Sequence, residues 1–403
     1  MNTMLETVAQ QAGCLDCGFC RYFVQCPGPS GCLGCGICIK GCPAGVRFLR
    51  ADGRARPSVR LTIDGRAFAV PGRITVQKAL ELCGAAGPRQ GCAHACRSGG
   101  CYECAVVVDG RVVAGCHTAV REGMAITTAP EETAAHAPLR LVSVFPGHLH
   151  AAVSLFTHGC NFGCAFCHNW DVTFSSSGRP VTPQELVRCL GRLPGADRQP
   201  RIAVSGGEPT LNRPWLIEFV RAVTREHQGV RLQVDTNGSL LTADYVDELR
   251  EAGMTDISID IKAARVDTFL GVTGLEDRER AGRYLETAWR AVEYIATAHR
   301  DRLYLVVGIP YHPRFISREE VAEIGEKLSS FHDRMDVNLI EYQPAFRMAG
   351  EADLPPGEPE EVRAVLEDAG LKKVWLQAGD HVPRATDPLD LLTGAGETAD
   401  SSW

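Results

Sequence analysis

Residues 160–167 read Cys160-Asn-Phe-Gly-Cys164-Ala-Phe-Cys167, and these three cysteines decide how the rest of the chain is interpreted. Thiolates at this spacing can hold three irons of a [4Fe-4S] cube. The next cysteine is Cys189, so we expect the fourth iron to keep an open position for a small chelating ligand. A cluster that only transfers electrons closes all four positions, whereas this one is suited to chemistry at the fourth. A zinc site lacking one ligand and three incidental cysteines are the alternatives.

The composition is that of a large protein rich in metal ligands. The chain has 403 residues, enough for two or three domains, and a net charge of −7 that gives no basic footprint for nucleic acid or an anionic membrane. The sequence shows neither an N-terminal signal region nor an apolar run long enough for a membrane span. Most of the 18 cysteines stand in tight groups, which favours metal binding over disulfides and predicts a reducing, cytoplasmic location.

The first cysteine group, in residues 1–50, contains two copies of one pattern. The second copy is the C-x2-C-x2-C-x3-C-P run of two-cluster ferredoxins, and the first has two extra residues before its last cysteine. We expect a ferredoxin-like segment with two [4Fe-4S] clusters that hold it together, with zinc as the alternative. In such ferredoxins the fourth cysteine of each run serves the other cluster, so the ligand assignment stays open. The expected ligands are Cys14, Cys17, Cys20, Cys26, Cys32, Cys35, Cys38 and Cys42.

The second group lies in residues 57–129, between two hairpin signals centred on Asp64-Gly65 and Asp109-Gly110. Its C-x4-C-x2-C spacing is the plant-type [2Fe-2S] run. The segment is similar to the β-grasp ferredoxin domain of succinate dehydrogenase iron–sulfur subunits. Gly99 and Gly100 are expected to let backbone N–H groups approach the bridging sulfides. The expected ligands are Cys96, Cys101, Cys104 and Cys116, which leaves Cys83 and Cys92 as incidental thiols or, for Cys92, an alternative ligand.

Residues 149–378 alternate six strand-like runs with amphipathic helices, which predicts an α/β fold, a partial TIM-like (β/α)6 barrel. Chemistry in such folds gathers at the carboxyl ends of the strands. The expected strands are Ala151–Thr157, Ile202–Ser205, Leu232–Asp235, Ile257–Ile261, Leu303–Val307 and Val337–Tyr342. The expected helices are Pro183–Leu193, Pro214–Glu226, Ala243–Ala252, Ala281–Ala298 and Ser317–Phe331.

Three stretches around these units are expected to be irregular. Residues 130–148 are predicted to be a linker into the barrel, and residues 379–403 a flexible tail. Five arginines form a basic link between the first two units, which is either a solvated linker or a docking site for an acidic electron donor. These are Arg47, Arg50, Arg54, Arg56 and Arg60.

Polar motifs follow the second, third and fourth predicted strands. They are Gly206-Gly207-Glu208-Pro209, Asp235-Thr236-Asn237-Gly238 and Asp260-Ile261-Lys262. Together with the 160–167 cysteines and Phe166, they resemble the radical S-adenosylmethionine (SAM) superfamily. The resemblance is strongest to activating enzymes of glycyl-radical enzymes, such as the activases of anaerobic ribonucleotide reductase and pyruvate formate-lyase, and covers roughly residues 150–345.

The resemblance implies that SAM chelates the unique iron of the cluster on Cys160, Cys164 and Cys167. One-electron cleavage of SAM then gives a 5′-deoxyadenosyl radical that abstracts hydrogen from a substrate. In this family the acidic positions can also hold a monovalent cation, which makes Asp235 and Asp260 candidates, together with Thr236. The implied SAM contacts are Phe166, Gly206, Gly207, Glu208, Pro209, Asp235, Asn237, Asp260 and Lys262.

The expected function is activation of a glycyl-radical enzyme, with the N-terminal clusters relaying electrons from a flavodoxin or ferredoxin. Two alternatives stay open: a radical SAM enzyme acting directly on a small molecule or peptide, and an electron-transfer protein that makes no radical. One departure separates this chain from activases with additional clusters. Those enzymes carry the clusters soon after the radical-SAM cysteines, whereas here they precede the barrel.

Overall fold

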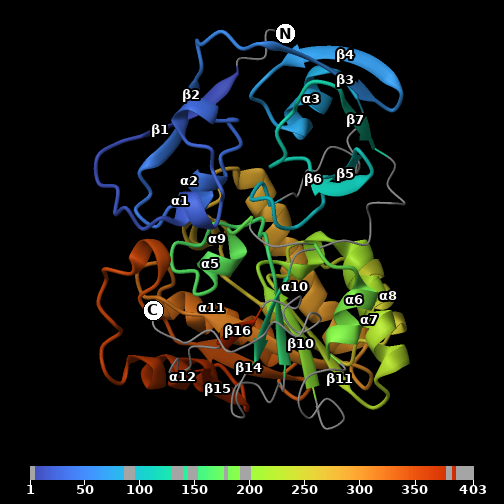
Figure 1. Ribbon diagram of the computed structural model, residues 1–403. Coiled ribbons are helices and arrows are strands. Elements are labelled where there is room, and N and C mark those ends of the chain that lie inside the picture. Colours follow the sequence, from blue (N-terminus) through green and yellow to red (C-terminus); the bar gives the residue numbers. More distant parts are fainter. Residues whose placement is uncertain are drawn as a thin grey trace.

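The computed structural model describes residues 5–85, 96–128, 153–176, 180–190 and 201–377, together with the backbone of 139–143 and 384–386. Figure 1 shows three units in chain order: a cysteine-rich segment in blue, a small mixed domain in light blue to teal, and a large α/β unit in green to red. The two N-terminal units lie over one end of the large unit. Cys92 lies outside the described residues.

The large unit is built on a nine-stranded sheet with the order β15-β14-β13-β12-β11-β10-β9-β8-β16. Six of its strands match the six predicted ones, so the α/β class and the parallel barrel-type sheet are confirmed. A seventh parallel strand, which the sequence did not indicate, extends the sheet. The parallel strands are β9 (Val153–Thr157), β10 (Arg201–Gly206), β11 (Arg231–Thr236), β12 (Asp256–Asp260), β13 (Tyr304–Pro310), β14 (Met335–Ile340) and β15 (Val374–Gln377).

Two short strands correct the predicted linker and tail. β8 (Leu139–Ser143) lies within the expected linker and pairs antiparallel with β9. β16 (Arg384–Thr386) lies within the expected tail and pairs antiparallel with β8. The predicted linker and tail thus each contain a short strand. The physical reason is that β9 would otherwise leave its outer N–H and C=O groups unpaired at a sheet edge.

Helices connect the parallel strands, and side-chain caps fix where several of them begin. Asn212 accepts a hydrogen bond from Trp215 N at the start of α7, and Ser317 accepts one from Glu320 N at the start of α11. Gly253, at a φ of 117°, ends α8 in the left-handed region. The helices are α5 (Trp170–Thr173), α6 (Pro183–Leu190), α7 (Arg213–Glu226), α8 (Ala243–Ala252), α9 (Val266–Thr273), α10 (Arg278–Ala298), α11 (Arg318–Ser329) and α12 (Glu358–Asp368).

The small domain has a five-stranded sheet with the order β4-β3-β7-β5-β6, in which β3 and β7 are parallel. Its helix α3 (Val76–Leu82) begins where the Thr75 hydroxyl accepts a hydrogen bond from Lys78 N. This arrangement agrees with the predicted β-grasp domain. The strands are β3 (Ser58–Ile63), β4 (Arg66–Pro71), β5 (Ala105–Val108), β6 (Arg111–Ala114) and β7 (Met124–Thr127).

The N-terminal segment contains little regular structure. Strands β1 (Glu6–Gln10) and β2 (Arg47–Ala51) form an antiparallel ribbon, and the single-turn helices α1 (Phe19–Tyr22) and α2 (Ile37–Lys40) carry cysteines of the two runs. The predicted basic link begins inside β2. Its arginines are largely engaged, because Arg54 and Arg56 both pair with Asp52.

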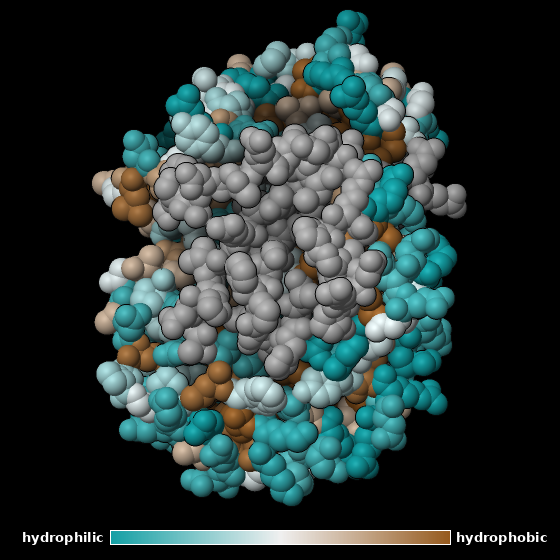
Figure 2. Space-filling model, turned by 60° about the horizontal axis from the view of Figure 1, so that its bottom comes forward, coloured by the Kyte–Doolittle hydropathy of each residue, from teal (hydrophilic) through white to brown (hydrophobic). Residues whose placement is uncertain are grey.

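Aromatic packing joins this segment to the barrel. Phe19 lies 5.1 Å from Trp170 between ring centroids, and Trp170 stacks on Phe346 at 5.2 Å. Figure 2 shows hydrophilic residues over most of the coloured part of one face, with hydrophobic residues in small separate groups. Within the described residues, no helix combines the length and apolar character needed to cross a membrane.

Candidate active site

The 160–167 loop begins directly after β9, at the carboxyl end of the sheet. Gly159 N donates to Thr173 O, and Gly163 N donates to Thr273 O, so backbone hydrogen bonds hold the loop at its start and near its middle. Burial raises the pKa of the Cys164 thiol, and raises that of Cys167 to about 12. Bound iron holds cysteine as thiolate, so three sulfur donors in one sheltered loop fit a cluster that supplies the missing positive charge.

A network of amides holds the first of these cysteines. Asn237 Nδ2 donates to Cys160 Sγ at 3.7 Å and to Asn161 Oδ1 at 3.0 Å. Asn161 Nδ2 in turn donates to Ser239 Oγ at 2.9 Å. Hydrogen bonds to a ligating sulfur orient it and tune the cluster. The sequence reasoning singled out Asn237 but missed Asn161 and Ser239, although Asn161 directly follows Cys160.

The Glu208 carboxylate is buried and already engaged by the chain. Its Oε1 accepts hydrogen bonds from Thr210 N at 3.0 Å, Thr210 Oγ1 at 2.5 Å and Thr236 Oγ1 at 2.6 Å, and its Oε2 accepts from Asn237 N at 2.7 Å. A carboxylate has about four lone-pair positions. The arrangement ties β10 to β11 and leaves little capacity for a ligand ammonium at this side chain.

The two glycines before Glu208 approach the cysteine loop. Gly207 N donates to Thr157 O, and Glu208 N donates to Gly159 O, both at 2.8 Å. A Cβ on Gly207 would collide with the Gly159 carbonyl, and one on Gly206, at a φ of 102°, would stand 2.5 Å from Thr157 N. At both glycines the space that a side chain would take is filled by backbone. Their first role is to let two loops meet.

Two acidic residues and one lysine complete the motifs at the ends of β11 and β12. Burial, together with repulsion from Asp260, raises the pKa of Asp235 to about 6. Lys262 Nζ lies 3.1 Å from Asp260 Oδ2. Although burial opposes the lysine charge, Asp260 and the Cys164 thiolate raise the pKa of Lys262 above its usual value. A permanent positive charge therefore stands beside the cysteine loop.

Phe166 packs in an aromatic cluster at the ends of β13 and β14. Its ring centroid lies 5.6 Å from that of Phe315, 5.9 Å from Tyr342 and 6.0 Å from His312. Pro209 lies buried at the start of a 3-10 helix of one turn, Pro209–Leu211. Both residues were predicted to contact SAM, and both are placed here by packing within the chain.

The [2Fe-2S] candidates of the small domain lie in a buried loop. Backbone N–H groups point at its sulfurs: Ser98 N and Cys101 N donate to Cys96 Sγ, both at 3.3 Å, and Cys116 N donates to Cys104 Sγ at 3.4 Å. Such donors suit iron-bound thiolates, so the loop fits the cluster. Of the two remaining described thiols, Cys83 ends α3 and Cys189 is buried in α6.

The two cysteine runs of the N-terminal segment interleave. Contact with the Cys38 thiol lowers the pKa of Cys20 to about 7 and that of Cys26 to about 6. The fourth cysteine of the first run therefore lies against the second run, as in ferredoxins whose runs exchange ligands. Cys14 and Cys17 are exposed. Among the described residues, no three His, Cys, Asp or Glu side chains converge on the position of a single ion.

Cysteine loops of all three units meet above the barrel. Lys40 Nζ, from α2, donates to Cys96 O at 2.6 Å and to Cys160 O at 3.1 Å. Asn212 Nδ2 donates to Cys101 O at 3.1 Å. A Cβ on Gly100 would stand 2.6 Å from Gly159 N, so Gly100 also lets the barrel loop approach. Sequence reasoning missed Lys40, whose only signal is its place within a cysteine run.

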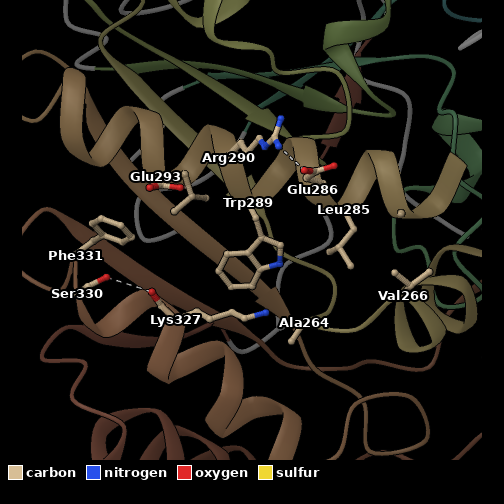
Figure 3. Close-up of a pocket in the computed structure, with 12 residues that line it drawn as sticks. Ala264, Val266, Leu285, Glu286, Trp289, Arg290, Glu293, Lys327, Ser330 and Phe331 are labelled. Carbon is tan, nitrogen blue, oxygen red and sulfur yellow. Dashed lines mark hydrogen bonds and ion pairs between the residues drawn. The ribbon is translucent and has the colours of Figure 1, made fainter. Parts of the chain in front are cut away.

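A cavity of about 530 Å³ lies elsewhere, on the outer side of the barrel between α10 and α11. Figure 3 shows Trp289 at its centre, with Lys327 below the ring and the Arg290–Glu286 ion pair above it. None of its lining residues belongs to the cysteine loop or to the three polar motifs.

Comparison with known proteins agrees with this site. Residues 154–328 match the family model of the radical SAM superfamily, and residues 56–131 match that of the 2Fe-2S iron-sulfur cluster binding domain. The chain therefore contains a radical SAM domain preceded by a [2Fe-2S] ferredoxin domain.

Relatives of the chain differ in what they act on. A provisionally named GTP 3′,8-cyclase of Thermoplasma volcanium is 33% identical over 32% of this chain and 38% of its own length. A provisionally named glycyl-radical enzyme activating enzyme of Methanocaldococcus jannaschii is 27% identical over 44% of this chain and 68% of its own length.

A solved domain of pyruvate-formate lyase-activating enzyme from Bacteroides vulgatus is 20% identical, with a TM-score of 0.35, over 44% of this chain and 98% of that domain. The chain spans between 36% and 59% of the length of several curated relatives. The comparisons thus identify the radical SAM domain but do not identify a substrate.

Proposed function

We propose that this radical SAM enzyme activates a glycyl-radical enzyme and that its N-terminal clusters relay the electrons. The observation that carries the proposal is the network linking the motif loops. Glu208 is bonded to Thr236 and to Asn237 N, and Asn237 reaches Cys160. The stretches shared with the activating enzymes thus form one connected site rather than three separate turns.

A [4Fe-4S] cluster with SAM supplies one-electron cleavage of a sulfonium C–S bond, which gives methionine and a 5′-deoxyadenosyl radical able to abstract hydrogen. Cys160, Cys164 and Cys167 would hold that cluster. Lys262 offers a fixed positive charge for a carboxylate, and Asp235 and Asp260 offer oxygens for ribose hydroxyls or a monovalent cation.

The chain's own contacts revise one predicted role within that proposal. Because its carboxylate is saturated, Glu208 would position the loop, and the SAM ammonium would be left to backbone carbonyls of Gly206 and Gly207. The N-terminal units lie over the cysteine loop and would help to exclude water from it.

The relay part of the proposal uses three [4Fe-4S] clusters and one [2Fe-2S] centre. Exposed Cys14 and Cys17 would mark the end where a protein donor such as a flavodoxin or ferredoxin delivers electrons. Plant-type [2Fe-2S] centres have potentials near about −400 mV, and cubic clusters reach about −700 mV. For a one-electron transfer, each step of about 59 mV to a more negative potential lowers the equilibrium constant about tenfold. An uphill transfer of roughly a hundred millivolts is therefore tolerable when cleavage of SAM follows irreversibly.

The test is a glycine-centred radical. Reconstituted enzyme, SAM and dithionite would be incubated with candidate glycyl-radical enzymes, and the partner's radical would be measured by electron paramagnetic resonance (EPR). We expect a glycine radical with at least one partner and none with the Cys160→Ala variant. Cleavage of SAM without a radical on any partner would reject the activase proposal while leaving the radical SAM chemistry in place.

Direct action on a small molecule is the second candidate, favoured by the GTP 3′,8-cyclases among the relatives. Incubation with GTP, SAM and dithionite distinguishes it. Consumption of GTP in step with 5′-deoxyadenosine would replace the activase proposal with this one.

A further inference from the structure

Lys40 occupies a position that neither cluster chemistry nor the SAM site accounts for. It ends α2, two residues after Cys38 and two before Cys42, so its main chain belongs to the ferredoxin-like segment. Its ammonium, however, leaves that segment. It donates to the carbonyl of Cys96 in the small domain and to the carbonyl of Cys160 in the barrel. One side chain thus bonds to cluster-binding cysteines of two other units.

The two loops that Lys40 bridges are also in direct contact. A Cβ on Gly159 would stand 2.6 Å from Cys101 N and 2.9 Å from Cys96 Sγ. The residue before Cys160 therefore touches a sulfur expected to ligate the [2Fe-2S] centre. Asn212, from the barrel, adds a hydrogen bond to Cys101 O on the same loop. Few atoms separate the cysteines of the small domain from those of the barrel.

Lys40 is the cation at this contact. Its ammonium is held between the carbonyls of Cys96, at 2.6 Å, and Cys160, at 3.1 Å. Arg97 is a second positive group in its surroundings. A cluster that accepts an electron gains negative charge, and a positive charge in a poorly hydrated place stabilises that state more than one in water.

We propose that Lys40 is a positioning residue for electron transfer, which fixes the [2Fe-2S] loop against the radical-SAM loop and favours the reduced state of both. The inference rests on the relay in the proposed function and identifies the [2Fe-2S] centre as the immediate donor to the cluster on Cys160. In that step one electron leaves the reduced [2Fe-2S] centre and enters the neighbouring cluster. No bond forms or breaks, Lys40 keeps its protons, and dithionite or the protein donor supplies the electron.

A purely structural lysine would behave differently. If Lys40 only held the domains together, its loss would loosen the interface without a specific change in the redox equilibrium. Arg347 offers the matched comparison, because it donates to the carbonyls of Ile39, Lys40 and Cys42 and so ties the barrel to the same helix end. Its backbone N–H donates to Ala165 O in the 160–167 loop, a bond that a substitution of the side chain leaves in place. The hydrogen bonds of its side chain go to the carbonyls of residues 39, 40 and 42.

The experiment is an EPR-monitored redox titration of full-length, reconstituted protein. At a fixed potential, Lys40→Met should lower the ratio of reduced to oxidised [2Fe-2S] centre about tenfold, a shift of about 59 mV to more negative potential. Lys40→Arg, which keeps the charge, should restore most of the ratio. Arg347→Met should leave it within twofold of wild type. SAM cleavage by Lys40→Met should slow more with a flavodoxin donor than with dithionite.

Two results would overturn the inference: a Lys40→Met ratio within twofold of wild type, or an equal shift in Arg347→Met. Should Lys40→Met lose iron, Lys40→Gln, which keeps a donor for one carbonyl without the charge, takes its place in the same titration. Neither measurement involves a glycyl-radical enzyme. Absence of a glycine radical on any partner would therefore count against the proposed function and leave the Lys40 result unaffected.

Discussion

Glu208→Gln should destabilise the barrel by more than the loss of one surface charge. The carboxylate accepts three hydrogen bonds at Oε1 and one, from Asn237 N, at Oε2. A glutamine can satisfy the first three through its oxygen, but its NH2 group then faces the Asn237 N–H. The substitution keeps the size of the side chain and changes only its charge and one acceptor.

The expected cost follows from that mismatch. A buried donor left without a partner costs about 1–3 kcal/mol, and both the Asn237 N–H and the new amide are in that position. Burial raises the pKa of Glu208, which means that the charged form is itself expensive, so part of the cost is recovered on neutralisation. A net loss of about 2 kcal/mol is expected, or about 4–8 °C in Tm for a unit of this size.

The assay is thermal unfolding together with SAM binding. Glu218→Gln is the control, because Glu218 lies on α7, the helix that follows the same turn, and accepts an exposed hydrogen bond from Gln184 on α6. Glu208→Gln should lower Tm. SAM affinity should fall only slightly, through distortion of the loop and not through loss of a direct contact. A variant with wild-type Tm and a large loss of SAM affinity would refute the reasoning, since Glu208 would then be a direct ligand of the ammonium.

Four further predictions concern the clusters and their surroundings. Alanine at any one of the three cysteines of the 160–167 loop should abolish formation of 5′-deoxyadenosine with dithionite, and wild-type cleavage by any of them would contradict the cluster assignment. Reconstituted protein should contain about fourteen irons per chain for three cubes and one [2Fe-2S] centre; about four irons with zinc in balance would show that the N-terminal cysteines are not iron sites. Gly100→Ala should cost about 1–3 kcal/mol in unfolding free energy, because its Cβ would stand 2.6 Å from Gly159 N, whereas Gly53→Ala, in open space, should cost little. The pKa of Asp235 is raised from 3.8 to about 6 in the folded state, so folding stability falls as pH rises from 4 to 7. Asp235→Asn should remove up to about 3 kcal/mol of that fall in SAM-free protein. An unchanged dependence of stability on pH would argue against this prediction.

The fold was predictable where buried apolar runs alternate with capped helices. Strand β12 and helix α8 fall within a residue of the predicted bounds, because Ile257 and Ile259 are buried and Gly253 stops the helix. Strands β8, β15 and β16 are short, and β15 carries the exposed Trp375. Pairing with a neighbour, rather than any pattern of their own, makes them strands.

The sequence predicted which motifs lie together at the site, but only partly what each residue in them contacts. The motifs meet at the carboxyl ends of the strands, as βα topology requires. That Gly207 serves the cysteine loop, and that Thr210 and Thr236 saturate Glu208, depends on which backbones touch. Lys40 could not be assigned from sequence, because its partners lie 56 and 120 residues away.

The contact between the Cys96 and Cys160 loops also constrains how the molecule matures. Cys96 and Cys101 are buried, and the barrel loop packs against them through Gly100 and Gly159. Iron and sulfide would therefore reach Cys96 and Cys101 more easily while the units are apart. Clusters assembled before the units dock would be enclosed by docking, so the closed arrangement would also protect them from solvent.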